Sequence, residues 1–267
     1  MENTPDQFEL IPPFCPNSHC LFHEGTKQRF FVKNGWVKTE KPPFRNQRYK
    51  CKKCGVQFSE NTFSVDFRKK IAGIGEKVMQ FSMNGMSNNS ISKLIKVAER
   101  TVRNRLVTLA RQSLYFEKCH LPKSVKEDIA YDGFETFSHS QFSPCYIMNS
   151  LSQLASEFRL FTDDHKSHAH EERDIQLGMK QEAALLEKIQ LMKIYRNFMT
   201  PKFVKKNKHD PDAHWASPAM YLGVAEKVLN FKEVFGLRRT FTQFNLDERE
   251  IAFIHRSYPF SRQVIAA

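Results

Sequence analysis

The stretch "NGMSNNSISKLIKVAERTVRNRLVTLAR", residues 84–111, predicts two helices joined by a tight turn. Ser87 is a typical N-cap for a short first helix. Apolar residues at helical spacing would form the inner face of this helix: Ile91, Leu94 and Ile95. A second helix would begin at Ala98 or Glu99 and bury three apolar side chains: Val102, Leu106 and Leu109. Upstream, the same spacing predicts another helix with an inner face of Ile71, Ile74, Val78 and Phe81.

The helix that begins near residue 98 would present polar and basic side chains outward: Arg100, Arg103, Asn104 and Arg111. A short helix, a tight turn and a helix with outward Arg and Asn form the helix-turn-helix arrangement, whose second helix can lie in the major groove of DNA. There, Arg pairs with guanine edges and Asn with adenine. An ordinary three-helix bundle with solvated charges is the alternative. We expect Arg100, Arg103 and Asn104 to contact DNA.

Two cysteine pairs precede these helices, in "CPNSHC" (15–20) and "YKCKKC" (49–54). Two short thiolate turns can place four sulfur ligands around one structural Zn²⁺ in tetrahedral geometry. The stretches between and after the pairs alternate apolar with polar residues, which predicts the short strands of a zinc ribbon. Gly55 fits the tight turn of a metal knuckle. The expected zinc ligands are Cys15, Cys20, Cys51 and Cys54.

Two alternatives at this site stay open from the sequence. The spacing between Cys15 and Cys20 is wider than usual for such a pair, so His19 or His23 could replace Cys20 as a ligand. The four cysteines could also be buried free thiols without a metal. In a reducing compartment, however, paired cysteines indicate metal binding rather than disulfides.

The charge balance indicates a polyanionic partner. The chain has 267 residues, with 41 Lys+Arg against 29 Asp+Glu and a formal net charge of +12. A cationic surface displaces the counterions condensed on phosphates, so double-stranded DNA is the leading expectation. The sequence contains no apolar run long enough to cross a bilayer, and its first residues do not resemble a signal peptide. We therefore expect a cytoplasmic, nucleoid-associated protein with no membrane partner.

A β-rich segment follows Pro122. Alternation in "KEDIAYDGFETFSHSQF" (126–142) predicts a strand that carries Asp132, and "PCYIMNSL" and "SEFRLF" predict two more. An acid within a β-rich run is costly unless it is solvated, paired or bound to metal.

The stretch "FTDDHKSHAHEERD" (161–174) allows three interpretations. Thr162 could cap a solvated helix, with Asp163 and Asp164 at its positive end. Helical spacing could instead bring together a transition-metal site: His165, His168 and Glu172. Alternatively, Asp132 and Asp163 could join Glu171, Glu172 or Asp174 in a carboxylate cluster, which suits Mg²⁺ and phosphodiester cleavage.

The remaining sequence predicts helices. The segment 180–203 has a helical pattern that ends before Pro201, with an inner face of Leu185, Ile189 and Met192. The segment 217–239 predicts a short helix pair broken by Gly223.

The order of these features resembles the DDE transposases of bacterial insertion sequences that have an N-terminal zinc ribbon. The resemblance is carried by the cysteine pairs, the predicted helix-turn-helix, and the strings "YDGFETF", "TDDH", "YRNFMTPKF" and "SPAMYLG". It implies an RNase H-like core that uses Mg²⁺ or Mn²⁺ to cut and join DNA. It also implies that Asp132 is the first catalytic acid and Asp163 the second. The third acid would be Asp174 or its neighbours Glu171 and Glu172.

The segment between the first two acids is shorter than this resemblance requires. Only residues 133–162 separate Asp132 from Asp163, whereas two strands and a helix with their turns need about 45 residues. We therefore expect an α+β protein with a zinc ribbon (1–66), a helix-turn-helix (67–122), a shortened RNase H-like remnant (123–200) and a helical tail (201–267).

The expected function is that of a transposase-like protein which binds element ends, with impaired catalysis. The alternative is a non-catalytic DNA-binding regulator or inhibitor of an intact transposase. A homo-oligomer or a complex with the intact transposase would follow. A structural zinc protein with a basic surface is a third class.

Overall fold

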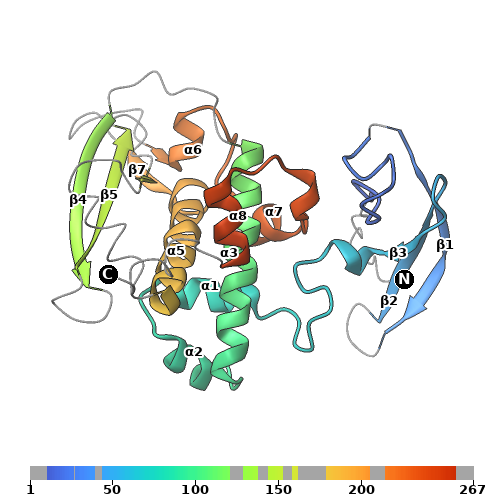
Figure 1. Ribbon diagram of the computed structural model, residues 1–267, viewed down its shortest axis with the longest axis horizontal. Helices are drawn as coiled ribbons and strands as arrows, with labels where there is room; N and C mark the ends of the chain where they lie inside the picture. Colours follow the sequence, from blue (N-terminus) through green and yellow to red (C-terminus); the bar gives the residue numbers. More distant parts are fainter. Residues whose placement is uncertain are drawn as a thin grey trace, which may run out of the picture. The chain divides into compact units, whose positions relative to one another are not determined.

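The protein is mixed α+β, as expected, and its backbone contacts divide it into two compact units (Figure 1). The first unit comprises residues 1–72 with 235–245, and the second comprises 73–234 with 246–267. The computed structural model describes residues 11–26, 28–39, 44–120, 129–137, 144–152, 158–161, 179–204 and 214–256. Within these ranges, no helix combines the length and apolar character needed to span a membrane.

The first unit is built on a three-stranded antiparallel sheet in the order β1-β2-β3. The strands are β1 (Phe31–Lys38), β2 (Arg45–Cys51) and β3 (Gln57–Ser59), followed by a 3-10 turn (Glu60–Phe63). The alternating pattern in the sequence predicted these short strands correctly. One face of the sheet is covered by a cluster of buried aromatic rings: Phe14, Phe30, Phe31, Tyr49, Phe58 and Phe63.

A segment from the far end of the chain completes this unit. The Arg238 backbone N–H donates a 2.6 Å hydrogen bond to the Phe63 carbonyl, and the Arg238 guanidinium lies 5.1 Å from the centroid of the Phe67 ring. Leu237 packs against the aromatic cluster. The helical pattern of residues 217–239 carried no prediction of this association, because it depends on contacts between residues far apart in the chain.

The second unit contains the three helices predicted around residues 84–111. These are α1 (Gly75–Met83), α2 (Asn88–Leu94) and α3 (Glu99–His120). Ser87 caps α2 as predicted, because its side chain accepts a hydrogen bond from the Ser90 N–H at 3.2 Å. One fully buried side chain from each helix meets in a common core: Val78, Ile91 and Val102.

Three details of the helix prediction were wrong. Ile71 precedes α1 and is 41% exposed, because the left-handed Gly73 delays the helix until Gly75. Leu94 is 55% exposed rather than internal, because α2 ends there and Ile91 and Ile95 fill the core instead. Arg111 is partly buried rather than fully outward, since α3 is enclosed along its second half.

The later elements of the second unit are mostly helical. They are α5 (Met179–Ile194), a π-helical turn (Tyr195–Met199), β7 (Lys202–Val204), β8 (His214–Ala216), α6 (Pro218–Tyr221), α7 (Phe231–Phe235) and α8 (Glu248–His255), and a 3-10 turn (Phe241–Gln243) in the first unit lies between the last two. The helical pattern ends before Pro201, and left-handed Gly223 follows α6, as predicted.

The buried face of α5 differs from the predicted one. Ile189 and Met192 are only partly buried, and the Leu185 side chain lies outside the described residues. The buried positions described on this helix and its extension are instead Ala183, Glu187, Leu191, Ile194, Asn197 and Phe198. The prediction placed only apolar residues inside, whereas Glu187 is buried and bound by Arg256 through two 2.6 Å hydrogen bonds.

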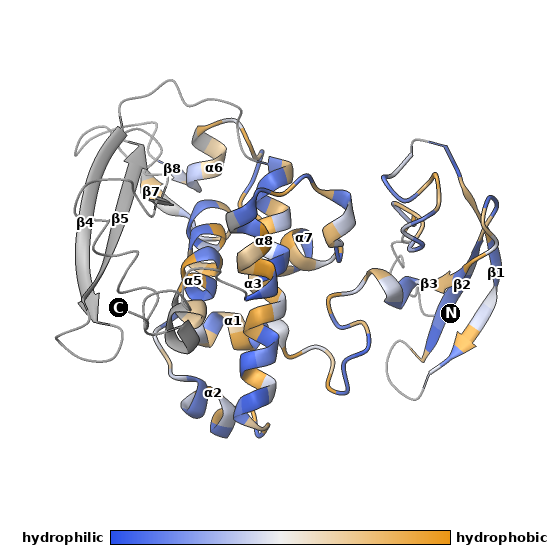
Figure 2. Cartoon of the chain, in the orientation of Figure 1, coloured by the Kyte–Doolittle hydropathy of each residue, from blue (hydrophilic) through white to orange (hydrophobic). Residues whose placement is uncertain are grey.

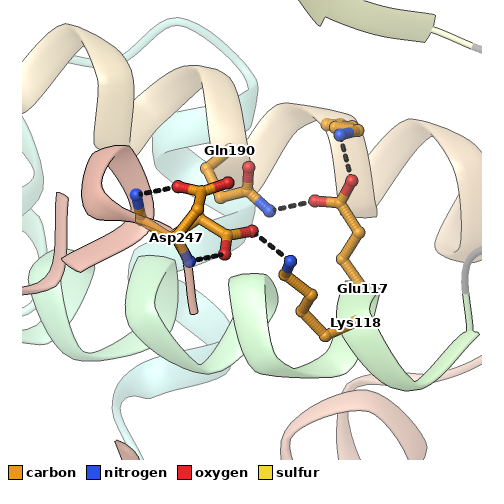
Figure 3. Close-up of polar contacts among 6 residues, drawn as sticks. Glu117, Lys118, Gln190 and Asp247 are labelled. Carbon is orange, nitrogen blue, oxygen red and sulfur yellow. Dashed lines mark hydrogen bonds and ion pairs between the residues drawn. The ribbon is translucent and has the colours of Figure 1, made fainter. Parts of the chain in front are cut away.

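Polar contacts join α3, α5 and α8 (Figure 3). Glu117 on α3 accepts a 2.6 Å hydrogen bond from Gln190 and pairs with Lys193, both on α5. Lys118, the next residue on α3, pairs with Glu250 on α8 at 2.6 Å. These contacts fix the long helix α3 between two neighbours.

The predicted β-rich segment forms β4 (Ile129–Phe137), β5 (Pro144–Ser152) and β6 (Phe158–Phe161). They form an antiparallel sheet in the order β4-β5-β6, so each strand pairs with the next in sequence. Asp132 lies on β4, as expected, and its register partner on β5 is Asn149.

Candidate metal centre and candidate DNA-binding helix

Four cysteines converge at one end of the sheet in the first unit. Cys15 and Cys20 lie in the loop that precedes β1, whereas Cys51 ends β2 and Cys54 lies in the turn to β3. Their sulfur atoms all lie within 4.8 Å of one another. Cys15, Cys20 and Cys51 are buried, and Cys54 is exposed. The structure thus brings together the four cysteines that the sequence singled out.

The sulfur separations fit a metal ion. The Cys15 and Cys54 sulfurs are 3.6 Å apart, and those of Cys20 and Cys51 are 3.8 Å apart. A tetrahedron with Zn–S bonds of about 2.3 Å has edges of about 3.8 Å. A disulfide would need a separation of about 2.05 Å. The cluster can therefore bind a metal such as zinc.

Local backbone turns hold the thiols in place. Gly55 has φ +75°, and its N–H donates a 3.0 Å hydrogen bond to the Cys51 carbonyl. The Cys51 N–H donates to the Val56 carbonyl at 2.9 Å, which closes the tight turn predicted at Gly55. On the other loop, the Cys20 N–H donates to Asn17 at 3.0 Å.

Neither neighbouring histidine joins the cluster. His23 is buried, with Nδ1 2.7 Å from the Cys15 carbonyl and Nε2 against the Thr242 hydroxyl. A carbonyl only accepts, so Nδ1 carries the proton and Nε2 accepts from Thr242. Both ring nitrogens are thus occupied. His19 is exposed and outside the group of sulfur atoms. The geometry favours Cys20 as the fourth ligand.

The thiols differ electrostatically. Burial raises the pKa of Cys15 and Cys20 well above the ordinary value. Burial also acts to raise the pKa of Cys54, but hydrogen bonds to Val56 and Asn17 outweigh it and lower that pKa to about 7. A cation at the centre of the cluster would stabilise all four thiolates.

The second candidate site is the first part of α3. Arg100, Arg103 and Asn104 are exposed, as predicted, and together with Glu99 they line an open hollow. Arg103 donates a 2.9 Å hydrogen bond to Glu99, one helical turn earlier, and both side chains remain about half exposed. In Figure 2, α2 and the adjoining end of α3 are coloured mainly hydrophilic.

The end of α2 and the turn to α3 add two cations that the sequence had not singled out. Lys93 and Lys96 are exposed, and Lys96 adopts a left-handed conformation with φ +55°. The Val97 N–H donates a 3.0 Å hydrogen bond to the Ser92 carbonyl, which closes the turn. The sequence signal for these residues was a pair of lysines near the end of the first predicted helix, three positions apart.

The acidic candidates are only partly described. Asp132 is placed on β4. The remaining acids and histidines of the predicted metal sites lie outside the described residues: Asp163, Glu171, Glu172, Asp174, His165 and His168. The described features with a clear chemical capacity are thus the sulfur cluster and the exposed cations of α3.

In comparisons with known proteins, no family model matches this chain, and no curated protein or solved structure is significantly similar to it.

Proposed function

We propose that the chain binds duplex DNA through the first turns of α3, as the second helix of a helix-turn-helix. The observation that carries the proposal is the exposure of Arg100, Arg103 and Asn104 on a helix whose opposite side is fixed in a three-helix core. The fixed core supplies the rigid support that base recognition needs. Arg and Asn are the side chains that pair with base edges in the major groove.

The nearby cations suit the phosphate backbone. Lys93 and Lys96 are exposed at the end of α2 and in the following turn. Phosphate contacts orient a protein on the duplex, whereas base contacts supply specificity. The formal net charge of +12 favours association with any polyanion. Base contacts by α3 would supply sequence specificity, and the cations would add electrostatic attraction to the phosphates of any duplex.

We further propose that the bound DNA is the end of an insertion sequence and that the sulfur cluster holds a structural Zn²⁺. The support for the first point is the transposase-like order of motifs in the sequence. The support for the second is the near-tetrahedral spacing of the sulfurs of Cys15, Cys20, Cys51 and Cys54. Four protein ligands leave no open position, so the metal would stabilise the first unit and take no part in catalysis.

Strand cleavage is impaired in this proposal. β4, β5 and β6 pair consecutively, and no helix is described between Asp132 and Phe161. β5 separates β4 from β6, so their backbones are about 9–10 Å apart. The position beside Asp132 on β5 is occupied by Asn149, an amide. A two-metal site needs several carboxylates around ions about 4 Å apart, and these described strands bring no second carboxylate beside Asp132.

The same observation favours a second candidate function. A chain that binds element ends without cutting them would occupy the sites of an intact transposase. It would act as a regulator or inhibitor of that enzyme, alone or in a mixed oligomer with it.

DNA binding is tested with Arg103→Ala against Arg196→Ala, which removes an exposed Arg elsewhere in the second unit. Duplexes selected by the wild-type chain from a random library serve as the probe. We expect Arg103→Ala to lose about 1–3 kcal/mol of specific binding, or roughly 5- to 150-fold. Arg196→Ala should leave specific binding nearly unchanged. Equal losses in the two variants would refute base recognition by α3.

Catalysis is tested with a duplex that carries the element end, in Mg²⁺ or Mn²⁺. We expect binding without strand cleavage, in the wild type and in Asp132→Ala alike. Cleavage by the wild type that disappears in Asp132→Ala would show that an active site is assembled, and it would refute the impairment.

A further inference from the structure

The sheet of the first unit carries an unusually one-sided charge. The described residues 28–39 and 44–59 contain no Asp or Glu. Their basic residues are Arg29, Lys33, Lys38, Arg45, Arg48, Lys50, Lys52 and Lys53. In Figure 2, β2 is coloured hydrophilic almost throughout. These cations belong to the first compact unit, whereas α3 belongs to the second.

Cations also face each other across the strands. Lys38, the last residue of β1, pairs in register with Arg45, the first residue of β2, next to the loop that connects the two strands. Like charges directly opposite each other destabilise an isolated sheet. A bound polyanion would remove this cost, because each cation could then contact a phosphate.

Large aromatic side chains are exposed on the same hairpin. Trp36 on β1 is 57% exposed, and Phe44, just before β2, is 59% exposed. The Thr39 N–H donates a 2.9 Å hydrogen bond to the Phe44 carbonyl, so the two strands stay paired next to these rings. The neighbouring aromatic cluster is already closely packed by other rings, such as Phe31 and Tyr49 at 5.1 Å. Trp36 and Phe44 are therefore available for a partner.

We propose that the β1–β2 ribbon is a second DNA-binding surface, which enters the major groove of duplex DNA. The major groove is about 12 Å wide and admits a two-stranded ribbon. Lys38 and Arg45 contact phosphates on the groove walls, while Trp36 and Phe44 contact the base edges and thymine methyl groups. This inference rests on the proposed DNA binding but assigns it to different residues in a different unit.

Trp36 provides a direct reporter. The chain has two tryptophans, so Trp215→Phe leaves Trp36 as the sole indole. The full-length variant is titrated with a duplex of random sequence, and binding is followed in parallel by the anisotropy of a dye on the DNA. We expect the Trp36 emission to shift and to saturate together with the anisotropy. An emission that stays constant while the duplex saturates would overturn the proposal. A response to single-stranded DNA alone would overturn the assignment to the major groove.

A charge comparison tests the phosphate contacts. The double variant Lys38→Gln/Arg45→Gln is compared with Arg196→Gln/Lys232→Gln, which removes two exposed cations from the second unit. Each lost phosphate contact lowers the slope of log K against log salt by about 0.9. We expect the ribbon variant to lower this slope by about 1.8 and the control by much less. Equal slopes for the two variants would overturn the proposal.

The test separates this inference from the function proposed for α3. If only that function is wrong, Arg103→Ala has no specific effect while the ribbon variant still weakens binding. If only the ribbon inference is wrong, Arg103→Ala still weakens specific binding, whereas the ribbon variant weakens binding no more than its control. Retention of bound metal in the ribbon variant shows that the first unit is still folded. Loss of the metal calls for the single variant Lys38→Gln, for which a slope decrease of about 0.9 is expected.

Discussion

Replacing Glu117 with Gln should destabilise the second unit by about 3 kcal/mol. The Glu117 side chain is 6% exposed, and its partner Lys193 is 15% exposed. The substitution keeps the shape of the side chain but removes its negative charge. It also turns an NH₂ group toward the donors of Lys193 or Gln190, where the carboxylate accepts from both.

The expected magnitude follows from burial. Removing one partner of a buried ion pair costs about 3–5 kcal/mol, because the other charge is left in a poorly solvated position. The lower end applies here, since Lys193 retains some contact with water. The matched comparison is Glu99→Gln, which breaks the pair with Arg103, where the side chains are 44% and 56% exposed. An exposed pair one helical turn apart contributes only about 0.3–0.5 kcal/mol.

The assay is urea unfolding followed by circular dichroism at 222 nm, which reports on the helices of the second unit. Glu117→Gln should raise the equilibrium constant for unfolding by more than about a hundredfold relative to the wild type. The double variant Glu117→Gln/Lys193→Met should recover most of the loss, because no unpaired charge remains. Equal, small losses in Glu117→Gln and Glu99→Gln would refute the argument from burial.

Three other substitutions test the metal centre, the N-cap of α2 and the core of the three helices. Cys51→Ser should abolish binding of one zinc per chain, measured by atomic emission, whereas Cys119→Ser, at an exposed thiol outside the cluster, should retain the metal. Ser87→Ala should cost about 1 kcal/mol in urea unfolding, because the Ser90 N–H loses its acceptor. Ile91→Ala should cost about 2–5 kcal/mol by the same measurement, since this side chain is fully buried between the three helices.

The features predicted well from the sequence are those set by near neighbours. The cap at Ser87 involves a residue three positions away, and the Cys51–Cys54 turn closes within a few residues. The convergence of the two cysteine pairs could be predicted because a metal site requires four ligands and the chain supplies two suitable turns. The strand pattern around Asp132 is likewise local.

The features that could not be predicted from the sequence depend on contacts with residues far away in the chain. Glu187 is buried in α5 because Arg256 neutralises it, and apolar periodicity alone predicts an exposed position for such a residue. His23 is unsuited to bind metal because Thr242 and the Cys15 carbonyl occupy its ring nitrogens. The four predicted segments (1–66, 67–122, 123–200 and 201–267) stay a prediction, whereas backbone contacts define two units.

Two DNA-binding surfaces in one chain would act together. Each surface alone needs to bind only weakly, because binding of the first raises the effective concentration of the second near the same duplex. Loss of either surface then removes most of the combined affinity. The affinity of such a complex is the product of the two single affinities and the effective concentration, so the losses in binding free energy from Arg103→Ala and from Lys38→Gln/Arg45→Gln should add in the triple variant. If each partial variant instead loses little affinity and only the triple variant loses much, either surface alone is sufficient for binding, and simultaneous binding of both surfaces to one duplex is refuted.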